Sequence, residues 1–341
     1  MGAEKPIKCL AITSKDGQLE DWEYTPEPLK PGDVDVRVLY NGLCHSDLHV
    51  WREDWGPCPF PMVPGHEVVG VVEEVGSSVN HLKKGDLVGV GWFRDACLEC
   101  DACVKGDDNV CPNGVGTIMG GQKGGFAERI RANAALAQLI PPEIDPAEAA
   151  PLLCAGITVW SPISRYVTRS GMKVGVVGLG GLGHLALQFA SAIGADVYAI
   201  SGTASKEKEA RGFGAKHFQK IDDVPDKTLD VILNTTPGGI KCADLVNKLT
   251  YNGQLVYLGG GTDKVDVLAF DLILAQRSIS GSATGGRALF REMFRIAGLH
   301  NVRPLIEKIP ISKANEAVEK LTNGNVRYRI VLETGDYFKN K

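Results

Sequence analysis

The first 155 residues alternate short apolar runs with glycine and proline. Valine and other β-branched residues dominate these runs, and side chains of this shape fit the pleated surface of a β-sheet. Four prolines between positions 57 and 64, and a cluster of glycines between 114 and 125, predict two irregular loops. This part of the chain is therefore predicted to be all-β. The predicted strands are 34–39, 68–75, 86–90 and 126–130.

The pattern changes near Pro146. Apolar residues at helical spacing fill 146–153 and 157–166, and buried-strand runs then alternate with helical stretches such as 182–193. Strands that alternate with helices are typical of βαβ units around a parallel sheet. The strands predicted here are 173–177, 197–200, 230–233, 254–258 and 278–281. Near the carboxyl end, the predicted elements are the strands 306–309 and 328–332 and the helix 312–321.

A glycine-rich turn joins the first of these strands to the helix that follows it. Residues 178–183 read Gly-Leu-Gly-Gly-Leu-Gly and match the pattern G-x-G-x-x-G. Between a strand and a helix, such glycines permit a tight turn and let a diphosphate approach the helix N-terminus. An ordinary glycine turn is the alternative. The residues predicted to contact a dinucleotide are Gly178, Gly180, Gly181, Leu182 and Gly183.

The end of the second strand indicates which dinucleotide is bound. In NAD-binding units, an acidic residue about 20 positions after the first glycine binds the ribose 2′-hydroxyl. Ser201 stands there in this chain, and Thr203 and Lys206 follow it. A carboxylate repels a 2′-phosphate, whereas hydroxyls and an ammonium group bind one. These residues favour NADP(H), with the alternative that Lys206 is a solvated lysine opening the next helix.

Four cysteines lie close together in the all-β part of the chain. Their spacing, C-x2-C-x2-C-x7-C, predicts a closed zinc site with four thiolate ligands. Disulfide pairing is the alternative, but disulfides are uncommon inside cells. A closed site has no position for a substrate, so we assign this one to folding. The four residues are Cys97, Cys100, Cys103 and Cys111.

A second set of metal-ligand residues is spread along the chain. Cys44, His66 and Cys154 lie in the short motifs C-H-S-D, G-H-E and L-C-A-G-I-T. Two thiolates and one imidazole leave a tetrahedral zinc ion with one open position, which is the catalytic arrangement. A single cysteine or histidine is otherwise most often a packed core residue. Both sets together predict two Zn²⁺ ions per chain, one catalytic and one structural.

Polar residues beside the second set offer supporting chemistry. Glu67 adjoins His66, and Asp47 is placed to orient a histidine ligand. Ser46 and His49 put a hydroxyl and an imidazole within one turn of the chain, which predicts a path for a proton. Other histidines are interpreted as ordinary packing or surface residues: His81, His184, His217 and His300.

Bulk composition narrows the function further. The 341 residues are too many for one ordinary core, so two domains are expected. A formal net charge of −4 argues against nucleic acid and against an anionic membrane surface as partners. No apolar run reaches the roughly 18 residues of a membrane span, and neither end carries a targeting signal. A cytoplasmic location is therefore expected, with the nine cysteines reduced or metal-bound.

These motifs resemble those of the zinc-dependent medium-chain alcohol dehydrogenases, and the resemblance covers essentially the whole chain. Three segments are similar to the ligand segments of that family: C-H-S-D-L-H at 44–49, G-H-E-x2-G at 65–70 and L-C-A-G-I-T at 153–158. The four-cysteine lobe is also complete. The resemblance implies reversible oxidation of a primary alcohol to an aldehyde, with a nicotinamide coenzyme carrying the hydride.

The same resemblance implies an α/β protein with two domains. A GroES-like β-barrel catalytic domain is expected to span 1–155 and 297–341 and to include a structural zinc lobe at 95–113. A Rossmann coenzyme domain, with a doubly wound parallel sheet, is expected to span 156–296.

Roles for single residues also follow from the resemblance. Thr158 is expected beside the nicotinamide, and Arg329 and His45 are expected near the coenzyme phosphates. Trp51 and Trp92 are expected to narrow the substrate pocket. For the catalytic zinc and for the proton path, the resemblance implies the same residues as the motifs above.

Different parts of the chain resemble different subfamilies. Segments 151–162 and 201–206 resemble NADPH-dependent cinnamyl alcohol dehydrogenases and aldehyde reductases. Trp51, Trp55 and Trp92 instead stand where yeast-type ethanol dehydrogenases carry tryptophans. The expected substrate is a small-molecule alcohol or aldehyde, and an NAD-dependent short-chain enzyme of yeast type is one alternative. A zinc-free reductase and a non-catalytic binding or structural protein on the same fold are the others. Residues 277–283 resemble the edge strand of family dimers, so a homodimer or homotetramer is expected.

Overall fold

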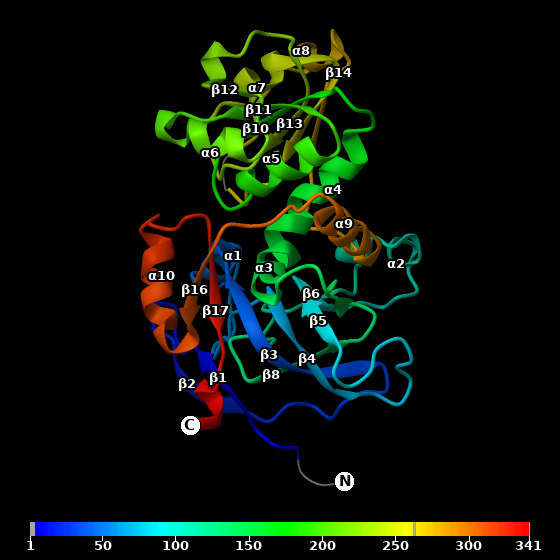
Figure 1. The fold of residues 1–341 in the computed structure, drawn as a ribbon, viewed down its shortest axis with the longest axis vertical. Helices are drawn as coiled ribbons and strands as arrows, with labels where there is room; N and C mark the ends of the chain where they lie inside the picture. The colour runs from blue at the N-terminus through cyan, green and yellow to red at the C-terminus, as the bar shows by residue number, and fades with distance from the viewer. Residues whose placement is uncertain (1–3, 262–263, 341) are drawn as a thin grey trace. The chain divides into compact units, whose positions relative to one another are not determined.

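The computed structural model describes residues 4–261 and 264–340, which form two compact units (Figure 1). The first unit runs to Cys154 and also contains Gly286–Phe294 and the segment from Pro304 onward. The second contains Ala155–Gly285 and Arg295–Arg303. The expected second boundary at 296/297 falls inside the helix α9 (Arg287–Leu299), which the two units share. The catalytic and coenzyme roles of the units stay a prediction, and the chain ends at 1–3 and 341 lie outside the described residues.

A sheet of seven strands forms the framework of the first unit. Its order is β16-β17-β3-β4-β5-β9, and β8 pairs with β3. Because β17 pairs with β3, the last strands of the chain complete a sheet begun near its start. Val34, Val36 and Val38 alternate along β3 and are at most 2% exposed, as the apolar pattern predicts. The strands are β3 (Asp33–Leu43), β4 (Val68–Val75), β5 (Leu87–Val90), β8 (Arg129–Asn133), β9 (Gln138–Leu139), β16 (Ile306–Pro310) and β17 (Arg329–Glu333).

Short elements complete this unit. The strand predicted at 126–130 begins only at Arg129, because residues 126–128 form no continuous ladder. The two predicted loops are irregular apart from the two-residue strand β7. The remaining strands are β1 (Ile7–Ala11), β2 (Glu20–Tyr24), β6 (Phe93–Asp95) and β7 (Val115–Gly116). The helices are α1 (His45–Trp51), α2 (Asp101–Lys105), α3 (Pro146–Pro151) and α10 (Ala314–Thr322).

The helix α3 continues into a π-helical segment, Leu152–Gly156, which contains Cys154. Pro151 lacks an amide hydrogen, so the regular helical hydrogen-bond ladder is interrupted where this segment begins. Single π-helical turns inside helices are frequent at functional sites. The predicted helices, 146–153 and 157–166, left out residues 154–156, so this widening was not predicted.

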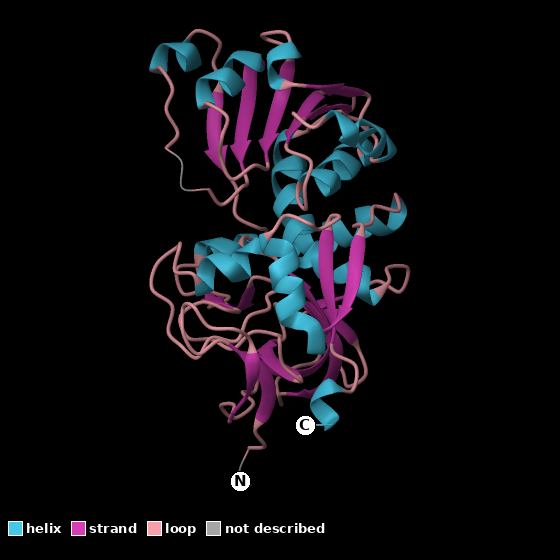
Figure 2. Ribbon diagram, turned by 90° about the vertical axis from the view of Figure 1, so that its left-hand side faces the viewer, coloured by secondary structure: helices cyan, strands magenta, loops and turns pink. Residues whose placement is uncertain are grey.

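A six-stranded parallel sheet forms the second unit, in the order β12-β11-β10-β13-β14-β15. The first strand, β10, and the fourth, β13, lie side by side, which is the order of doubly wound dinucleotide-binding sheets. Figure 2 shows helices on both faces of this sheet. The strands are β10 (Lys173–Val177), β11 (Asp196–Ile200), β12 (His217–Gln219), β13 (Leu229–Asn234), β14 (Leu249–Tyr257) and β15 (Ser278–Gly281). The helices are α4 (Ile157–Tyr166), α5 (Gly183–Ala192), α6 (Glu207–Gly212), α7 (Cys242–Lys248) and α8 (Ala269–Ile273).

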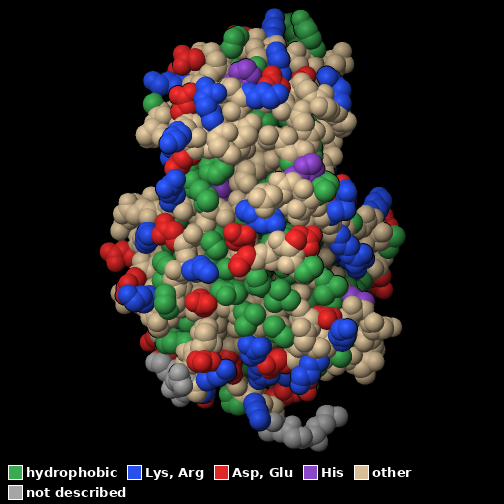
Figure 3. Space-filling model, viewed as in Figure 1, with side chains coloured by type: hydrophobic (Ala, Val, Ile, Leu, Met, Phe, Trp, Pro, Cys, Tyr) green, Lys and Arg blue, Asp and Glu red, His purple; other side chains and the backbone are tan. Residues whose placement is uncertain are grey.

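Charged side chains of both signs are interspersed on the face of the molecule seen in Figure 3. This distribution matches the small net charge of −4. Within residues 4–261 and 264–340, no helix has the length and apolar character needed to cross a membrane.

Candidate metal centre and coenzyme loop

Four buried side chains converge in the first unit. Cys44, His66, Glu67 and Cys154 each offer one ligand atom, and these atoms all lie within 4.8 Å of one another. His66 Nε2 and Glu67 Oε2 are buried and have no hydrogen-bond partner. Buried polar atoms without a partner are costly, and a cation satisfies both atoms at once. A zinc ion fits this donor set, so the structure brings the three predicted ligands together with one added carboxylate.

The Asp47 carboxylate connects two of the ligand segments. Its Oδ1 accepts from His66 Nδ1 at 3.0 Å and from the Gly65 amide at 2.9 Å. Its Oδ2 accepts from the Cys44 amide at 3.0 Å, and the side chain is completely buried. A carboxylate that accepts from Nδ1 leaves Nε2 of the same ring as the metal-facing atom. The predicted orienting role of Asp47 therefore has a geometric basis.

Glu67 is held by an arginine from the far end of the sequence. Arg329, on β17, donates through Nη2 to Glu67 Oε1, and its Nη1 lies 3.8 Å from Cys44 Sγ. Burial raises the pKa of Glu67 to about 7, while the guanidinium of Arg329 acts in the opposite direction. Gly42 makes room for this carboxylate, because a Cβ there would lie 1.8 Å from Glu67 Oε2. The contact of Arg329 with coenzyme phosphates stays a prediction, and no local sequence pattern indicates its contact with Glu67.

The two thiols of the cluster affect each other. A hydrogen bond between Cys44 and Cys154 lowers the pKa of Cys44 well below its ordinary value. The same bond raises the pKa of Cys154. Burial opposes ionisation of Cys44, whereas the neighbouring Arg329 favours it. The thiolate is the form that binds a metal, so Arg329 supports ligand binding as well as holding Glu67.

Aromatic rings cover one side of the histidine ligand. The Trp92 ring meets the His66 ring edge-on with 4.9 Å between centroids. Trp55 lies 6.1 Å from Trp92 and stacks on His49 at 4.9 Å. Trp92 therefore contacts a residue of the metal cluster, and its predicted place in the substrate pocket stays a prediction.

Trp51 does not lie in this group of rings. It is 6% exposed and packs in the apolar core of the first unit together with Leu48. The two residues are three positions apart on α1, so they share one helix face, and this spacing was the available signal. Trp55, rather than Trp51, lies next to Trp92.

The predicted proton path has a gap. Ser46 Oγ lies 3.6 Å from Cys44 Sγ, whereas His49 Nδ1 is 2.8 Å from Asp54 Oδ2. In the described part of the chain no hydrogen bond joins Ser46 to His49, so a path through both requires a group between them. His45 is exposed on α1, and Thr158 is buried on α4 in the second unit.

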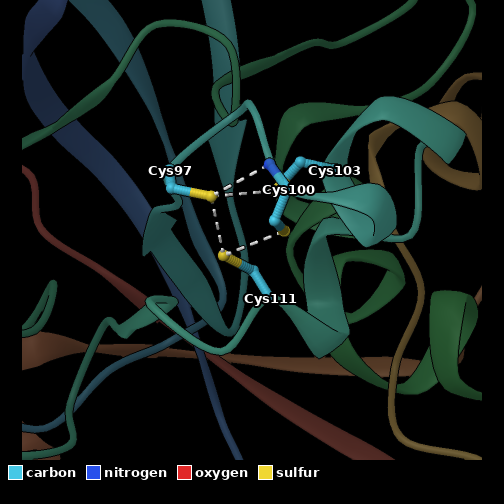
Figure 4. Close-up of side chains that lie close together, drawn as sticks. All are labelled: Cys97, Cys100, Cys103 and Cys111. Atoms are coloured by element: carbon cyan, nitrogen blue, oxygen red, sulfur yellow. Dashed lines mark hydrogen bonds between the residues drawn. The ribbon is translucent and has the colours of Figure 1, made fainter.

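The four-cysteine lobe forms a separate cluster (Figure 4). The Sγ atoms of Cys97 and Cys111 are 3.5 Å apart, and the pairs Cys97–Cys103 and Cys100–Cys111 are each 3.9 Å apart. A tetrahedral zinc ion with Zn–S bonds of about 2.3 Å separates its sulfurs by about 3.8 Å. A disulfide would need about 2.05 Å, and all nine cysteines are free. Amide groups of Glu99 and Cys100 lower the pKa of Cys97 to about 6, which favours its thiolate.

We expect Cys103→Ser to release one zinc ion and to destabilise the first unit. Cys103 is completely buried, and structural zinc binding is coupled to folding. The melting temperature should fall by roughly 10 °C, since about 1 kcal/mol corresponds to 2–4 °C in a domain of this size. Cys9→Ser is the matched control, because Cys9 is equally buried but lies in the apolar core. Equal zinc content and equal melting temperatures in the two variants would contradict the assignment.

The glycine loop of the second unit follows β10. Gly178 has φ +90°, and a Cβ on Gly183 would lie 2.0 Å from the Gly178 carbonyl oxygen, so both positions require glycine. Gly180 is exposed, and a Cβ there would meet no atom within 4 Å. The loop is therefore tight on its inner side and open on its outer side, as a diphosphate site requires.

The residues predicted to select the coenzyme lie beside this loop. Ser201 Oγ accepts from the Thr203 amide at 3.2 Å. Lys206 Nζ donates to the Leu179 carbonyl oxygen at 2.9 Å, so this lysine is partly buried against the glycine loop. Both chain segments are at the carboxyl ends of adjacent parallel strands, where ligands of such sheets bind.

Comparisons with known proteins agree with this geometry. Residues 30–142 match the family model described as "Alcohol dehydrogenase GroES-like domain", and 181–298 match "Zinc-binding dehydrogenase". The chain is 37% identical to the aldehyde reductase AdhA of Synechocystis, over 96% of this chain and 98% of that protein. The cinnamyl alcohol dehydrogenase SbCAD4 of Sorghum bicolor has a TM-score of 0.92 at 37% identity, covering 96% and 98% of the two chains. The chain belongs to the zinc-dependent medium-chain alcohol dehydrogenases.

A further solved structure bears on the coenzyme of a relative. The cinnamyl alcohol dehydrogenase of Helicobacter pylori, complexed with NADP(H), has a TM-score of 0.90 at 33% identity, covering 96% and 98% of the two chains. Membership of the family confirms the predicted α/β fold, with its GroES-like and Rossmann parts. It also confirms that this alcohol dehydrogenase is an oxidoreductase acting on CH–OH groups and that its family binds zinc.

Proposed function

We propose that this alcohol dehydrogenase transfers hydride reversibly between NADP(H) and a primary alcohol or aldehyde. The observation that carries the proposal is the buried convergence of Cys44, His66 and Cys154, with Asp47 behind the histidine. The names of two relatives, an aldehyde reductase and a cinnamyl alcohol dehydrogenase, support aldehydes as the substrate class. The NADP(H) complex of a third relative supports the coenzyme.

The residues of the chain prepare the site for this chemistry. Zinc, when bound, supplies a Lewis acid that polarises a carbonyl group, and the coenzyme supplies the hydride. Asp47 holds His66 in the tautomer whose Nε2 faces the cluster. Arg329 holds Glu67 and offsets the negative charge of Cys44. The Trp92 ring packs edge-on against the His66 ring and shields that side of the ligand.

The coenzyme proposal depends on the end of β11. Ser201 offers no carboxylate for the ribose hydroxyls of NAD. The Lys206 ammonium, at the start of α6, donates to the Leu179 carbonyl of the glycine loop. A positive charge and two hydroxyls at this position favour a 2′-phosphate. The alternative, an NAD-dependent enzyme of yeast type, is favoured by one observation, the tryptophan pair Trp55 and Trp92 near the metal cluster.

Initial rates with a panel of aldehydes and both coenzymes test the proposal. We expect aldehyde-dependent oxidation of NADPH with a higher kcat/KM than that of NADH, and the matching primary alcohol as product. A preference for NADH would support the yeast-type alternative. Absence of aldehyde reduction with either coenzyme, in protein that contains zinc, would contradict the proposed function.

Removal of His49 tests the proton path. We expect His49→Gln to slow alcohol oxidation mainly at low pH, where solvent alone accepts a proton poorly, and to leave zinc content unchanged. General acid–base groups contribute about 10²–10⁴-fold, and His49 acts at a distance, so a loss of about tenfold is expected. Asp54→Asn, which removes the partner of His49, should show a smaller loss at the same pH. Unchanged pH profiles in both His49→Gln and Ser46→Ala would rule out the path.

Substitution of Trp92 tests the substrate pocket. We expect Trp92→Ala to raise kcat/KM for cinnamaldehyde relative to a short aliphatic aldehyde by about tenfold, because a large side chain beside His66 is removed. Trp51→Phe is the control, since Trp51 is a core residue and its loss should change stability but not this ratio. If Trp92→Ala lowers the rates for both aldehydes equally, Trp92 is structural.

Assembly and location complete the proposal. We propose a homodimer or homotetramer, because α8 and its flanks lie near the edge strand β15 and expose several apolar side chains. Leu268, Phe270, Ile273 and Leu274 are 65–72% exposed. None of the nine cysteines forms a disulfide, which supports a reducing, cytoplasmic location.

A further inference from the structure

His184 is a buried histidine to which the proposed mechanism gives no role. It lies in the first turn of α5 and is completely buried. Its Nδ1 is 3.1 Å from the Gly180 carbonyl oxygen, and its ring meets Phe213 edge-on with 5.6 Å between centroids. A carbonyl oxygen only accepts hydrogen bonds, so Nδ1 carries the proton and donates. The sequence analysis assigned this residue no function.

A second side chain holds the preceding carbonyl of the same loop. Lys206 Nζ donates to the Leu179 carbonyl oxygen at 2.9 Å. Lys206 is the N-cap of α6, and Phe213, which packs on His184, is the C-cap of that helix. Both ends of α6 therefore contact the glycine loop or a residue that holds it. Figure 1 shows α5 and α6 beside β10 and β11.

Holding these two carbonyl groups also fixes the direction of two amide groups. In a trans peptide, the carbonyl and the following N–H point in opposite directions. The bond from Lys206 to Leu179 thus turns the Gly180 N–H to the opposite side, and the bond from His184 to Gly180 does the same for the Gly181 N–H. Within the described residues neither amide has an acceptor in the chain. Gly180 is also exposed, so these amides are available to an anion.

We propose that His184 is a positioning residue for the coenzyme, which keeps the Gly181 amide directed at the coenzyme diphosphate. The inference rests on the proposed coenzyme function of the loop. His184 does not touch the coenzyme; it acts through the peptide that joins Gly180 to Gly181. The His184 amide also donates to the Gly180 carbonyl at 3.1 Å, so removal of the side chain does not leave that oxygen without a partner. The Gly180 carbonyl then keeps one of its two donors, so the expected effect is a weaker hold on the direction of this peptide and not a loss of fold.

Binding measurements that need no turnover separate positioning from packing. The dissociation constants of NADPH, NADH and adenosine 2′-phosphate are measured for the wild type, His184→Leu and His184→Asn. Adenosine 2′-phosphate lacks the diphosphate, so it reports on the neighbouring ribose site alone. We expect His184→Leu to weaken the binding of NADPH and of NADH by the same factor, about 3–10-fold, as for the loss of one hydrogen bond. The affinity for adenosine 2′-phosphate should not change. His184→Asn keeps an N–H donor near the Nδ1 position and should restore most of the affinity.

Lys206→Ala should give a contrasting pattern, because the proposed function pairs its ammonium with the 2′-phosphate. Binding of adenosine 2′-phosphate and NADPH should weaken more than binding of NADH. If His184→Leu weakens adenosine 2′-phosphate as much as the dinucleotides, or His184→Asn restores nothing, the positioning role is wrong. If His184→Leu does not fold, His184→Gln takes its place. The Gln side chain is one methylene longer than Asn, so its amide does not coincide with the Nδ1 position, and the same weakening of dinucleotide binding is expected. A wild type that binds neither dinucleotide overturns the proposed function itself, and this outcome is established before any variant is compared.

Discussion

His66→Ala should lose one of two zinc ions and reduce turnover by at least about 10³-fold while the protein stays folded. A metal acting as Lewis acid contributes several kcal/mol to transition-state stabilisation, and each 1.36 kcal/mol is tenfold in rate. The variant leaves the four-cysteine lobe intact, so the structural ion should remain. Zinc content by elemental analysis, together with kcat and the melting temperature, measures all three expectations.

A matched control for this variant is His300→Ala, which makes the same change at an exposed position. It should keep two zinc ions and full activity. Asp47→Asn tests the support of the ligand, because loss of a carboxylate behind a histidine ligand typically costs about 10–100-fold in metal affinity or activity. Full activity in a zinc-poor His66→Ala protein would show that the buried cluster is not the catalytic site.

Ser201→Asp should reverse the coenzyme preference. The new carboxylate repels the 2′-phosphate of NADPH and offers an acceptor to the ribose hydroxyls of NADH. A charge-assisted hydrogen bond contributes about 1.5–3 kcal/mol, so kcat/KM for NADPH should fall by roughly 10²-fold while that for NADH rises. The control is Ser170→Asp, which places the same charge just before β10, at the opposite end of the parallel strands.

Lys206→Ala extends this test. Loss of the ammonium should weaken NADPH binding about 10–100-fold, because the coenzyme proposal pairs its charge with the 2′-phosphate. NADH should weaken only severalfold, through the lost bond to Leu179 on the glycine loop. Lys216→Ala, at an exposed lysine beyond α6, should change neither coenzyme. A wild type that prefers NADH, or equal weakening of NADPH and NADH binding by Lys206→Ala, would contradict the NADP(H) proposal.

Local patterns allowed much of the fold to be predicted from the sequence. The strand β10, its glycine loop and the helix α5 were predicted within one residue, because the period of apolar residues and the glycines agree there. The strand β4 matches its prediction fully. The hairpin of β1 and β2 was not predicted, since β2 reads Glu-Asp-Trp-Glu-Tyr and offers few apolar residues to recognise.

Long-range contacts could not be predicted in this way. The ion pair of Arg329 with Glu67 joins residues 262 positions apart, and no local pattern records it. The position of Trp51 has a different cause: helical periodicity places it with Leu48 on the buried face of α1, and the motif resemblance does not contain that local signal. The π-helical turn that carries Cys154 depends on how Pro151 interrupts a continuing helix, which apolar spacing does not reveal.

The most direct test of the account follows NADPH-dependent aldehyde reduction against zinc content during stepwise removal of the metal by a chelator. If Cys44, His66 and Cys154 hold the catalytic ion, activity should fall in proportion to the loss of one of two zinc ions and return when Zn²⁺ is added back. Full aldehyde reduction by protein that retains no zinc would contradict the account.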